Sequence, residues 1–205
     1  MKEPAREGLL VDGIGAPLAA EDSGSVELPD GSSIAYHAIA PDNASALQRF
    51  HHRLSERSIY LRFFAAKPEL SDREAGYFTN LDKINRFALV AVDPERPEEI
   101  IGVVSFDREG TTERAEYAAE VEDGWQGRGL GLALTRRLVE AALKRDVRTF
   151  TAIVLPENTR MLHLLRDLGL PERLRYEDDA DFVEIDLSPP QNTSDRRAGA
   201  SGPGG

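Results

Sequence analysis

The residues of this chain whose types and spacing point most clearly to a binding role form a glycine-rich turn ahead of a helical segment. Gly127, Gly129 and Gly131 alternate along the turn, and the apolar pattern of residues 132–143 follows them. The first backbone N–H groups of a helix have no partner inside it, and they lie at the positive end of its dipole. Glycine lets a ligand approach these groups closely. The turn therefore predicts a binding site for phosphate or pyrophosphate.

Two common phosphate-binding loops do not match this turn. A P-loop needs lysine and then serine or threonine after its last glycine, and no such pair follows here. The dinucleotide fingerprint, Gly-x-Gly-x-x-Gly, would place its last small residue at Leu132 or Leu134. The pattern that remains is Gln-x-x-Gly-x-Gly, formed by Gln126, Gly129 and Gly131. One alternative stays open, in which the glycines only pack the helix against a sheet.

Composition limits the classes of protein to which this chain can belong. Its 205 residues fit one domain, and 40% hydrophobic with 30% charged residues is ordinary for a globular protein. The absence of cysteine excludes disulfides, zinc–thiolate sites and thiol catalysis. The net charge of −11 argues against nucleic acid as a partner and mildly favours cationic partners. There is no apolar run of membrane-spanning length and no signal-peptide pattern, so we expect a cytoplasmic protein without a membrane partner.

Apolar patterns and turn signals predict the elements that position the turn. Residues 26–31 and 33–39 are predicted to form a hairpin around Asp30-Gly31, and further strands are predicted at 87–92, 100–106, 114–121, 149–155 and 182–187. Helices are predicted from residue 41 to about 54, from 72 to about 80, over 132–143 and from 158 to 169, and Ser71-Asp72-Arg73-Glu74 matches a capping box at the start of the second helix. The short segment 58–64, between the first two helices, is compact and aromatic.

This order predicts a mixed α/β domain built on one sheet. The helix after the glycine turn connects strand 114–121 to strand 149–155, and such a crossover makes the two strands parallel. We expect the domain to span residues 25–187. Residues 1–24 and 188–205 lack an apolar period, and they are predicted to be a disordered leader and a disordered tail.

The element order and the glycine pattern together resemble the GNAT superfamily of N-acetyltransferases, from about Ser32 to Leu187. A second motif, Leu54 to Phe64, is similar to the Leu-Ser-x-x-Ser-x-Tyr-x-Arg-Phe-Phe segment of bacterial protein lysine acetyltransferases. Those enzymes modify acyl-CoA synthetases and related metabolic enzymes. Three further segments resemble the same group of enzymes, namely 115–118, 125–131 and 155–158.

The resemblance implies both a fold and an activity. The fold is a mostly antiparallel mixed sheet flanked by helices, with a parallel strand pair that splays apart at the cofactor site. The activity is transfer of acetyl from acetyl-CoA, without a metal, to a lysine amine of a protein such as an acyl-CoA synthetase. Two alternatives remain open: transfer to a small amine, and an acyl-CoA-binding regulatory module without turnover.

The resemblance also implies roles for acidic residues of strand 114–121. Glu116 falls on the catalytic glutamate of the family, by its distance from the glycines. A lysine amine has a pKa near 10.4, and a carboxylate can remove its proton directly or through water. Glu120 is the second choice for this base, and it stands where relatives usually have an apolar residue. It could also attract a cationic acceptor, and both glutamates could simply be solvated charges on a strand face.

Cofactor contacts follow from the same resemblance. Val121 is expected to offer a backbone N–H to the thioester carbonyl, and Asn158 is expected to reach the pantetheine arm, to cap a helix, or both. Arg128 is expected to face phosphate, although a solvent-facing side chain is an open alternative. The pyrophosphate is expected to bind the backbone of Gln126, Gly127, Arg128, Gly129, Leu130 and Gly131.

Two positions depart from the family pattern. Many relatives carry a tyrosine seven residues after the asparagine, as general acid for the leaving thiolate, and here Leu165 occupies that position. The Gly-Phe pair that usually closes this helix is Gly169-Leu170. The histidines show no metal-ligand spacing, so no metal site is predicted. Because Leu165 replaces the tyrosine, we expect coenzyme A thiolate to leave without a tyrosine proton donor.

Overall fold

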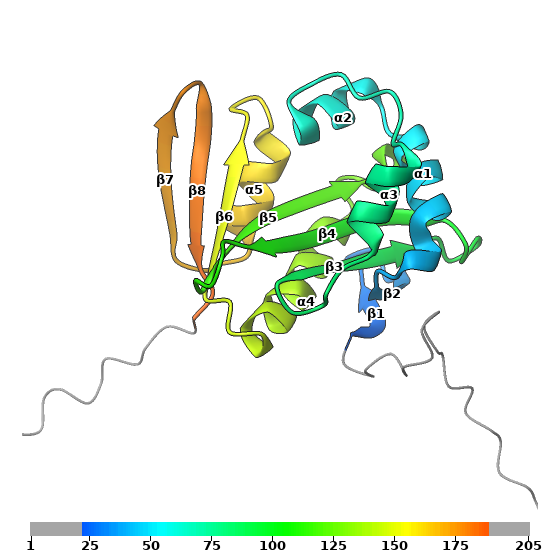
Figure 1. Cartoon of the computed structure of the whole chain (residues 1–205), viewed down its shortest axis with the longest axis horizontal. Coiled ribbons are helices and arrows are strands. Elements are labelled where there is room, and N and C mark those ends of the chain that lie inside the picture. Colours follow the sequence, from blue (N-terminus) through cyan, green and yellow to red (C-terminus); the bar gives the residue numbers. More distant parts are fainter. Residues whose placement is uncertain (1–21, 189–205) are drawn as a thin grey trace, which may run out of the picture.

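A single eight-stranded sheet organises the molecule, in the order β1-β2-β3-β4-β5-β6-β8-β7 (Figure 1). The computed structural model describes residues 22–188. The strands are β1 (Ser23–Glu27), β2 (Ser33–Ala38), β3 (Arg86–Val92), β4 (Ile100–Arg108), β5 (Arg114–Val121), β6 (Thr149–Val154), β7 (Glu172–Glu177) and β8 (Ala180–Asp186). The helices are α1 (Ala44–Arg53), α2 (Glu56–Phe63), α3 (Asp72–Thr79), α4 (Leu130–Lys144) and α5 (Thr159–Asp167), with 3-10 turns η1 (Pro41–Asn43) and η2 (Asp123–Trp125).

One pair of neighbouring strands, β5 and β6, is parallel, and the other neighbouring pairs of the sheet are antiparallel. The parallel register joins Arg114 to Thr149 and Glu116 to Thr151, and it extends no further toward Val121. Figure 1 shows β5 and β6 meeting at one end and diverging toward the other. The predicted mixed sheet with a splayed parallel pair is confirmed.

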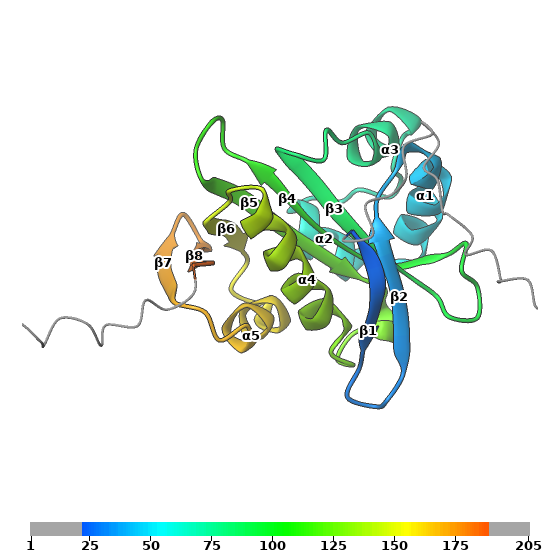
Figure 2. The ribbon, with the colours of Figure 1, turned by 90° about the horizontal axis from the view of Figure 1, so that it is seen from below.

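Helices cover both faces of the sheet (Figure 2). α4 and α5 lie on one face, and α1 and α3 lie on the other. α4 buries Leu130, Leu134 and Leu138, spaced four residues apart, against the sheet. On the opposite face, Leu47 and Phe50 of α1 belong to a second apolar core that includes residues of β3. Within residues 22–188, no helix has the length and apolar character needed to cross a membrane.

The structure changes the predicted organisation at two places. Segment 58–64, to which no element was assigned, is helical and lies almost wholly in α2, so three helices stand where two were predicted. Ser55 caps α2 by accepting a hydrogen bond from the Ser58 backbone N–H, and of its residues only Ile59 is buried. β1 begins at Ser23, inside the predicted leader. Apart from residues 22–24 and Ser188, the predicted leader and tail lie outside the described residues.

α3 begins at a capping box, as the sequence predicted. Ser71 Oγ accepts a hydrogen bond from the Glu74 backbone N–H at 3.4 Å, and the Glu74 carboxylate accepts one from the Ser71 backbone N–H at 3.0 Å. The two bonds satisfy donors that otherwise have no helical partner.

Removal of this cap should destabilise the domain. Ser71→Ala should lower the free energy of unfolding by about 1 kcal/mol, because one N–H group at the start of α3 loses its acceptor. Urea denaturation measures the change. Ser71→Asp retains an acceptor oxygen at the cap, and it should remain close to the wild type. Equal losses of unfolding free energy in Ser71→Ala and Ser71→Asp would contradict the capping role of Ser71.

Candidate active site

The glycine turn requires glycine for two separate reasons. Gly129 forms the N-cap of α4 with a φ of 90°, a conformation that side chains disfavour. A Cβ at Gly129 would also lie 2.9 Å from Cδ of Pro29, in the turn between β1 and β2. A Cβ at Gly131 would lie 2.9 Å from Cδ1 of Leu164 on α5. The glycines therefore provide an open helix N-terminus and also allow close packing beneath it.

The β1–β2 turn holds the glycine turn through a charged pair. Arg128 donates to Asp30 at 2.8 Å, and its guanidinium lies 4.2 Å from the centre of the Trp125 ring. Hydrogen bonds from Ser32 and Arg128 hold the pKa of Asp30 below its ordinary value. In this structure Arg128 therefore has a protein partner, and its contact with phosphate stays a prediction.

The Gln126 side chain links the end of β5 to α2. Its Nε2 group donates to the Val121 carbonyl at 2.8 Å and to Ser58 Oγ at 3.1 Å, while its Oε1 atom accepts from Arg160. The Val121 carbonyl is therefore occupied from within the protein. Sequence reasoning considered only the backbone of Gln126, and it did not anticipate this bridging role.

Asp123 fixes the start of α2 beside the glycine turn. Its carboxylate accepts from Ser55 Oγ at 2.7 Å, from the Ser55 backbone N–H at 2.9 Å and from Ser58 Oγ at 3.0 Å. Burial acts to raise the pKa of Asp123, but these hydrogen bonds outweigh it and lower the pKa. They give the two serines of the 54–64 motif a structural role, which the sequence alone did not reveal.

A cleft of about 1040 Å³, here called the main cleft, extends from the glycine turn along β5 and β6. Glu116 also lines it. Each predicted cofactor-binding residue is among its lining residues, namely Val121, Gln126, Gly127, Arg128, Gly129, Leu130, Gly131 and Asn158. The structure thus brings Glu116 and the predicted cofactor-binding residues together around one cleft.

Backbone groups of β5 face the main cleft because β6 has diverged. Glu122 N–H bonds to β4, whereas the Ala115 carbonyl accepts from Thr151 on β6. Backbone groups point alternately to the two sides of a strand. The N–H groups of Ala119 and Val121 are therefore directed toward β6 beyond the end of the paired register. The contact of Val121 N–H with the thioester carbonyl stays a prediction, and Ala119 N–H is a second group facing the cleft that sequence reasoning missed.

Asn158 caps α5 and also lines the main cleft. Its Oδ1 atom accepts from the Met161 backbone N–H at 3.2 Å, which confirms the predicted capping. Seven residues later, Leu165 is 2% exposed and belongs to the core. Leu165 therefore offers no proton to a leaving group, as the sequence indicated.

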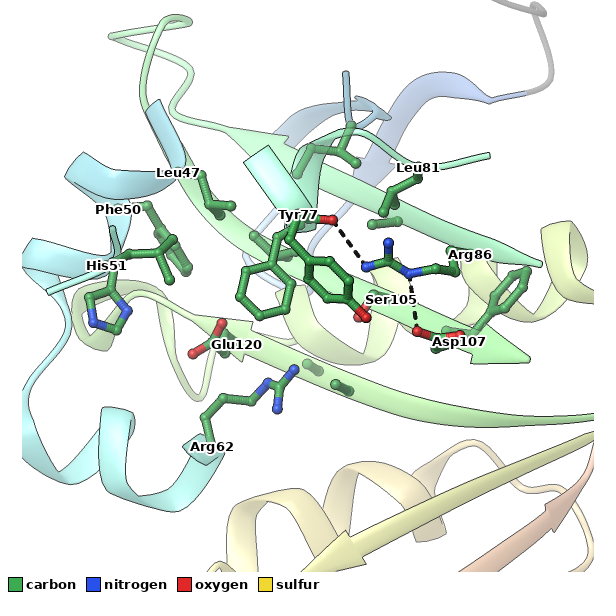
Figure 3. A pocket seen from close by; sticks show the side chains of 18 of the residues that line it. Leu47, Phe50, His51, Arg62, Tyr77, Leu81, Arg86, Ser105, Asp107 and Glu120 are labelled. Atoms are coloured by element: carbon green, nitrogen blue, oxygen red, sulfur yellow. Dashed lines mark hydrogen bonds and ion pairs between the residues drawn. The ribbon is translucent and has the colours of Figure 1, made fainter. Parts of the chain in front are cut away.

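A second cavity, of about 230 Å³, lies beneath α1 and α3 on the face of the sheet opposite α4 (Figure 3). Its walls include the aromatic residues Phe50, Phe63, Tyr77 and Phe78. The main cleft and the second cavity share Arg62, Glu116, Ala118, Ala119 and Glu120. The two spaces therefore meet over β5, and both predicted glutamates lie at the junction.

The two glutamates differ in their surroundings. Glu116 is exposed. Glu120 retains partial exposure as a residue, but its Oε1 atom is shielded from solvent and, within the described part of the chain, has no hydrogen-bond partner. Burial raises the pKa of Glu120, and the charges of Arg62 and His51 only partly oppose this. Glu120 is thus a desolvated carboxyl group facing a cavity.

The fold and the site define a group-transfer enzyme. Within residues 22–188, the site combines a helix N-terminus suited to phosphate, a strand with unpaired N–H groups, and a carboxylate at the junction of two cavities. This combination suits transfer of a group from a bound donor to a separate acceptor. Among residues 22–188, no group of three or more histidine, cysteine, aspartate or glutamate side chains is arranged to hold a metal.

Comparison with known proteins specifies the family. The model of the acetyltransferase (GNAT) family matches residues 42–170, well over half of the chain. The chain belongs to the GNAT family of acetyltransferases. It is a GNAT N-acetyltransferase, and acetyl-CoA is the typical co-substrate of this family. The resemblance found in the sequence is confirmed.

Solved structures agree with this assignment. The GNAT domain of S. lividans PAT is 34% identical, with a TM-score of 0.76, covering 82% of this chain and 98% of that one. A cAMP-binding acyltransferase from Mycobacterium smegmatis is 24% identical, with a TM-score of 0.58, over 82% of this chain and 48% of that one. A putative acetyltransferase from Salmonella typhimurium with acetyl-CoA shares the fold at 16% identity, with a TM-score of 0.60, over 77% of this chain and 96% of that one.

The buried carboxyl group of Glu120 should make stability depend on pH. Its pKa in the folded state lies above the ordinary 4.5, so the native state binds more protons than the unfolded chain. Its contribution to stability is full below 4.5 and is lost as the pH rises toward the folded pKa. Glu120→Gln should therefore be more stable than the wild type, by a margin that grows with pH.

Urea denaturation at about pH 5 and about pH 8 measures this margin. Glu177→Gln, at an exposed position on β7, is the control, and it should show little change. A margin that stays the same at both pH values would contradict a raised pKa.

Proposed function

We propose that this enzyme transfers acetyl from acetyl-CoA to a lysine side chain of a protein such as an acyl-CoA synthetase, with Glu116 as general base. The observation that carries the proposal is the junction of the main cleft with the second cavity over β5. The cleft provides for the donor, the second cavity provides for the acceptor, and Glu116 lines both. Similarity to the S. lividans PAT domain and the 54–64 motif support a protein acceptor.

The main cleft suits coenzyme A. The N–H groups from Gly127 to Gly131 would hold the pyrophosphate, since the first turn of α4 is open and carries no acidic side chain, whereas the Gln126 N–H already donates to the Asp123 carbonyl at 3.3 Å. Asn158 and the N–H group of Val121 would contact the pantetheine arm. Bound acetyl-CoA supplies a thioester, whose carbonyl carbon is open to attack by an amine.

Glu116 would remove a proton from the acceptor. At neutral pH a lysine side chain is almost entirely protonated, and only the neutral amine is a nucleophile. Transfer of the proton to the Glu116 carboxylate, directly or through a water molecule, leaves a nitrogen lone pair to form the amide bond. The carbon–sulfur bond breaks, the thiolate leaves with its electron pair, and the second proton that the nitrogen loses passes to the thiolate or to water.

Ala119 is better placed than Val121 to stabilise the carbonyl oxygen as it gains negative charge. Along a strand, Ala119 lies about 10 Å from Glu116 between Cα atoms, whereas Val121 lies about 16 Å away. A base and an oxyanion donor must act on the same reacting group. We therefore assign the carbonyl contact to Ala119 N–H and leave Val121 N–H for the pantetheine amide.

Replacement of the proposed base should slow the chemical step. Glu116→Gln should lower kcat by about a hundredfold or more, because the amide cannot accept the proton, while the KM for acetyl-CoA stays near its wild-type value. Release of coenzyme A thiol with an acyl-CoA synthetase as acceptor measures both constants. Glu177→Gln is the charge-matched control. Unchanged kcat in Glu116→Gln would exclude Glu116 as the base.

The same assay tests the acceptor. A panel should include an acyl-CoA synthetase, a lysine peptide and small amines such as spermidine. Release of thiol with small amines but not with any protein or peptide lysine would exclude the proposed substrate class and favour a small-amine acetyltransferase.

The glycine turn yields a separate prediction for cofactor binding. Gly129→Ala should weaken coenzyme A binding by about tenfold or more, since φ is 90° there and the new Cβ meets Pro29. Gly110→Asn, in the loop between β4 and β5 and outside the lining of both cavities, is the matched control, because asparagine tolerates a positive φ and a Cβ at this position would meet nothing within 4 Å beyond its chain neighbours. Calorimetric titration measures both. Equal affinity in the two variants would contradict the role of Gly129.

A further inference from the structure

Glu120 is a second carboxyl group at the reaction junction, and the mechanism above does not use it. It follows Glu116 by four residues on the same face of β5, so their Cα atoms lie about 13 Å apart. Ala118 lies between them on that face, and its small side chain leaves the space above it open. A glutamate carboxyl group extends roughly 5 Å from its Cα. A nitrogen above Ala118 is therefore within reach of the Glu116 carboxylate and of a Glu120 side chain that rotates toward it.

The carboxylate of Glu120 has no counter-charge bonded to it. Arg62 and His51 are the nearby cations, yet no hydrogen bond or ion pair joins either of them to Glu120 in the described part of the chain. His51 Nε2 instead lies 2.7 Å from the Lys67 carbonyl, and the Arg62 guanidinium lies 5.1 Å from the centre of the Phe63 ring. Figure 3 shows the Glu120 carboxylate turned toward the α1 side of the cavity. A buried carboxyl group without a partner is costly unless a ligand supplies one.

The remaining charges of the second cavity are already matched. Arg86 donates to Asp107 at 3.1 Å and to the Tyr77 carbonyl at 3.0 Å (Figure 3). The guanidinium of Arg86 also stacks 3.8 Å from the centre of the Tyr77 ring. The charge available to a ligand therefore comes from the two glutamates, Arg62 and His51, with a net negative balance when both glutamates are ionised and His51 is neutral.

The walls of the second cavity suit an alkyl chain that ends in a cation. Leu47, Phe50, Phe63 and Phe78 offer apolar surface, and aromatic faces also attract ammonium groups. An acyl chain lying in this cavity would place methylene groups against the Glu120 carboxyl group and satisfy neither of its oxygens. The cavity therefore favours an amine acceptor over an extended acyl group of the donor.

We propose that Glu120 binds the acceptor ammonium group, and that the second cavity selects an unbranched aliphatic primary ammonium, with its alkyl arm between the aromatic walls. The role of Glu120 during turnover rests on the function proposed above. Glu120 holds the cation above Ala118, beside Glu116, which then removes the proton. Glu120 sets acceptor affinity, and Glu116 sets the rate of the chemical step.

Steady-state kinetics of Glu120→Gln and Glu120→Leu, with Nα-acetyl-lysine methylamide as acceptor, test this division. The acceptor KM should rise about tenfold or more in both variants, while the KM for acetyl-CoA and the kcat at saturating acceptor change little. The pH dependence of kcat should be retained in both variants and lost in Glu116→Gln. Glu177→Gln controls for the loss of one negative charge elsewhere.

A direct binding measurement tests the ammonium subsite independently of the proposed function. Titration with n-butylammonium chloride, followed by amide NMR signals of β5, should show saturable binding to the wild type that is at least about tenfold weaker in Glu120→Leu. Uncharged n-butanol should bind weakly to both proteins. Binding of n-butylammonium without turnover of any lysine acceptor would support the subsite and overturn the proposed function.

Three results would overturn the subsite. One is an unchanged acceptor KM in both Glu120 variants, with turnover intact. Another is n-butylammonium affinity that does not depend on Glu120. The third is collapse of kcat together with loss of the pH dependence in Glu120→Gln, which would make Glu120 the base. Thermal unfolding of each variant verifies that the protein compared is folded.

Discussion

The divergence of β6 from β5 is the constraint on which the site depends. Hydrogen-bond pairing between these strands stops at Glu116, although β5 continues to Val121. A fully paired β6 would occupy the N–H groups of Ala119 and Val121 and would close the main cleft. A parallel pair needs a crossover connection, and α4 provides it with its N-terminus at the open end of the strands. One topological feature thus positions both the glycine turn and the N–H groups of Ala119 and Val121.

Contacts between residues distant in the sequence keep this opening in shape. Asp123 holds the start of α2 through Ser55 and Ser58, and Asp30 holds Arg128 from the other side. These interactions involve partners 65 to 98 residues apart. Because α2 carries Arg62 and Phe63 into the second cavity, the same contacts also shape that cavity. A few polar residues therefore connect the main cleft with the second cavity.

Sequence reasoning succeeded where local rules apply and was incomplete where packing decides. The glycine turn, the capping box of α3 and the parallel strand pair follow from backbone geometry and connection length, and each was predicted. α2 was missed because only Ile59 of its residues is buried, which leaves too weak an apolar period. β7 was not located because all of its residues are exposed, so that no alternation marks it. Both elements depend on neighbours supplied by the rest of the fold.

The sequence by itself determined the family, the glycine turn and the pair of glutamates on one strand face, because these depend on short-range spacing. Only the tertiary structure decided how the two glutamates differ. Glu116 is exposed at the junction of the two cavities, whereas burial leaves an oxygen of Glu120 without a hydrogen-bond partner among residues 22–188. Desolvation is set by all the elements that surround a group, and those elements come from distant parts of the chain. For that reason strand periodicity placed both carboxylates on the correct face but could not separate their roles.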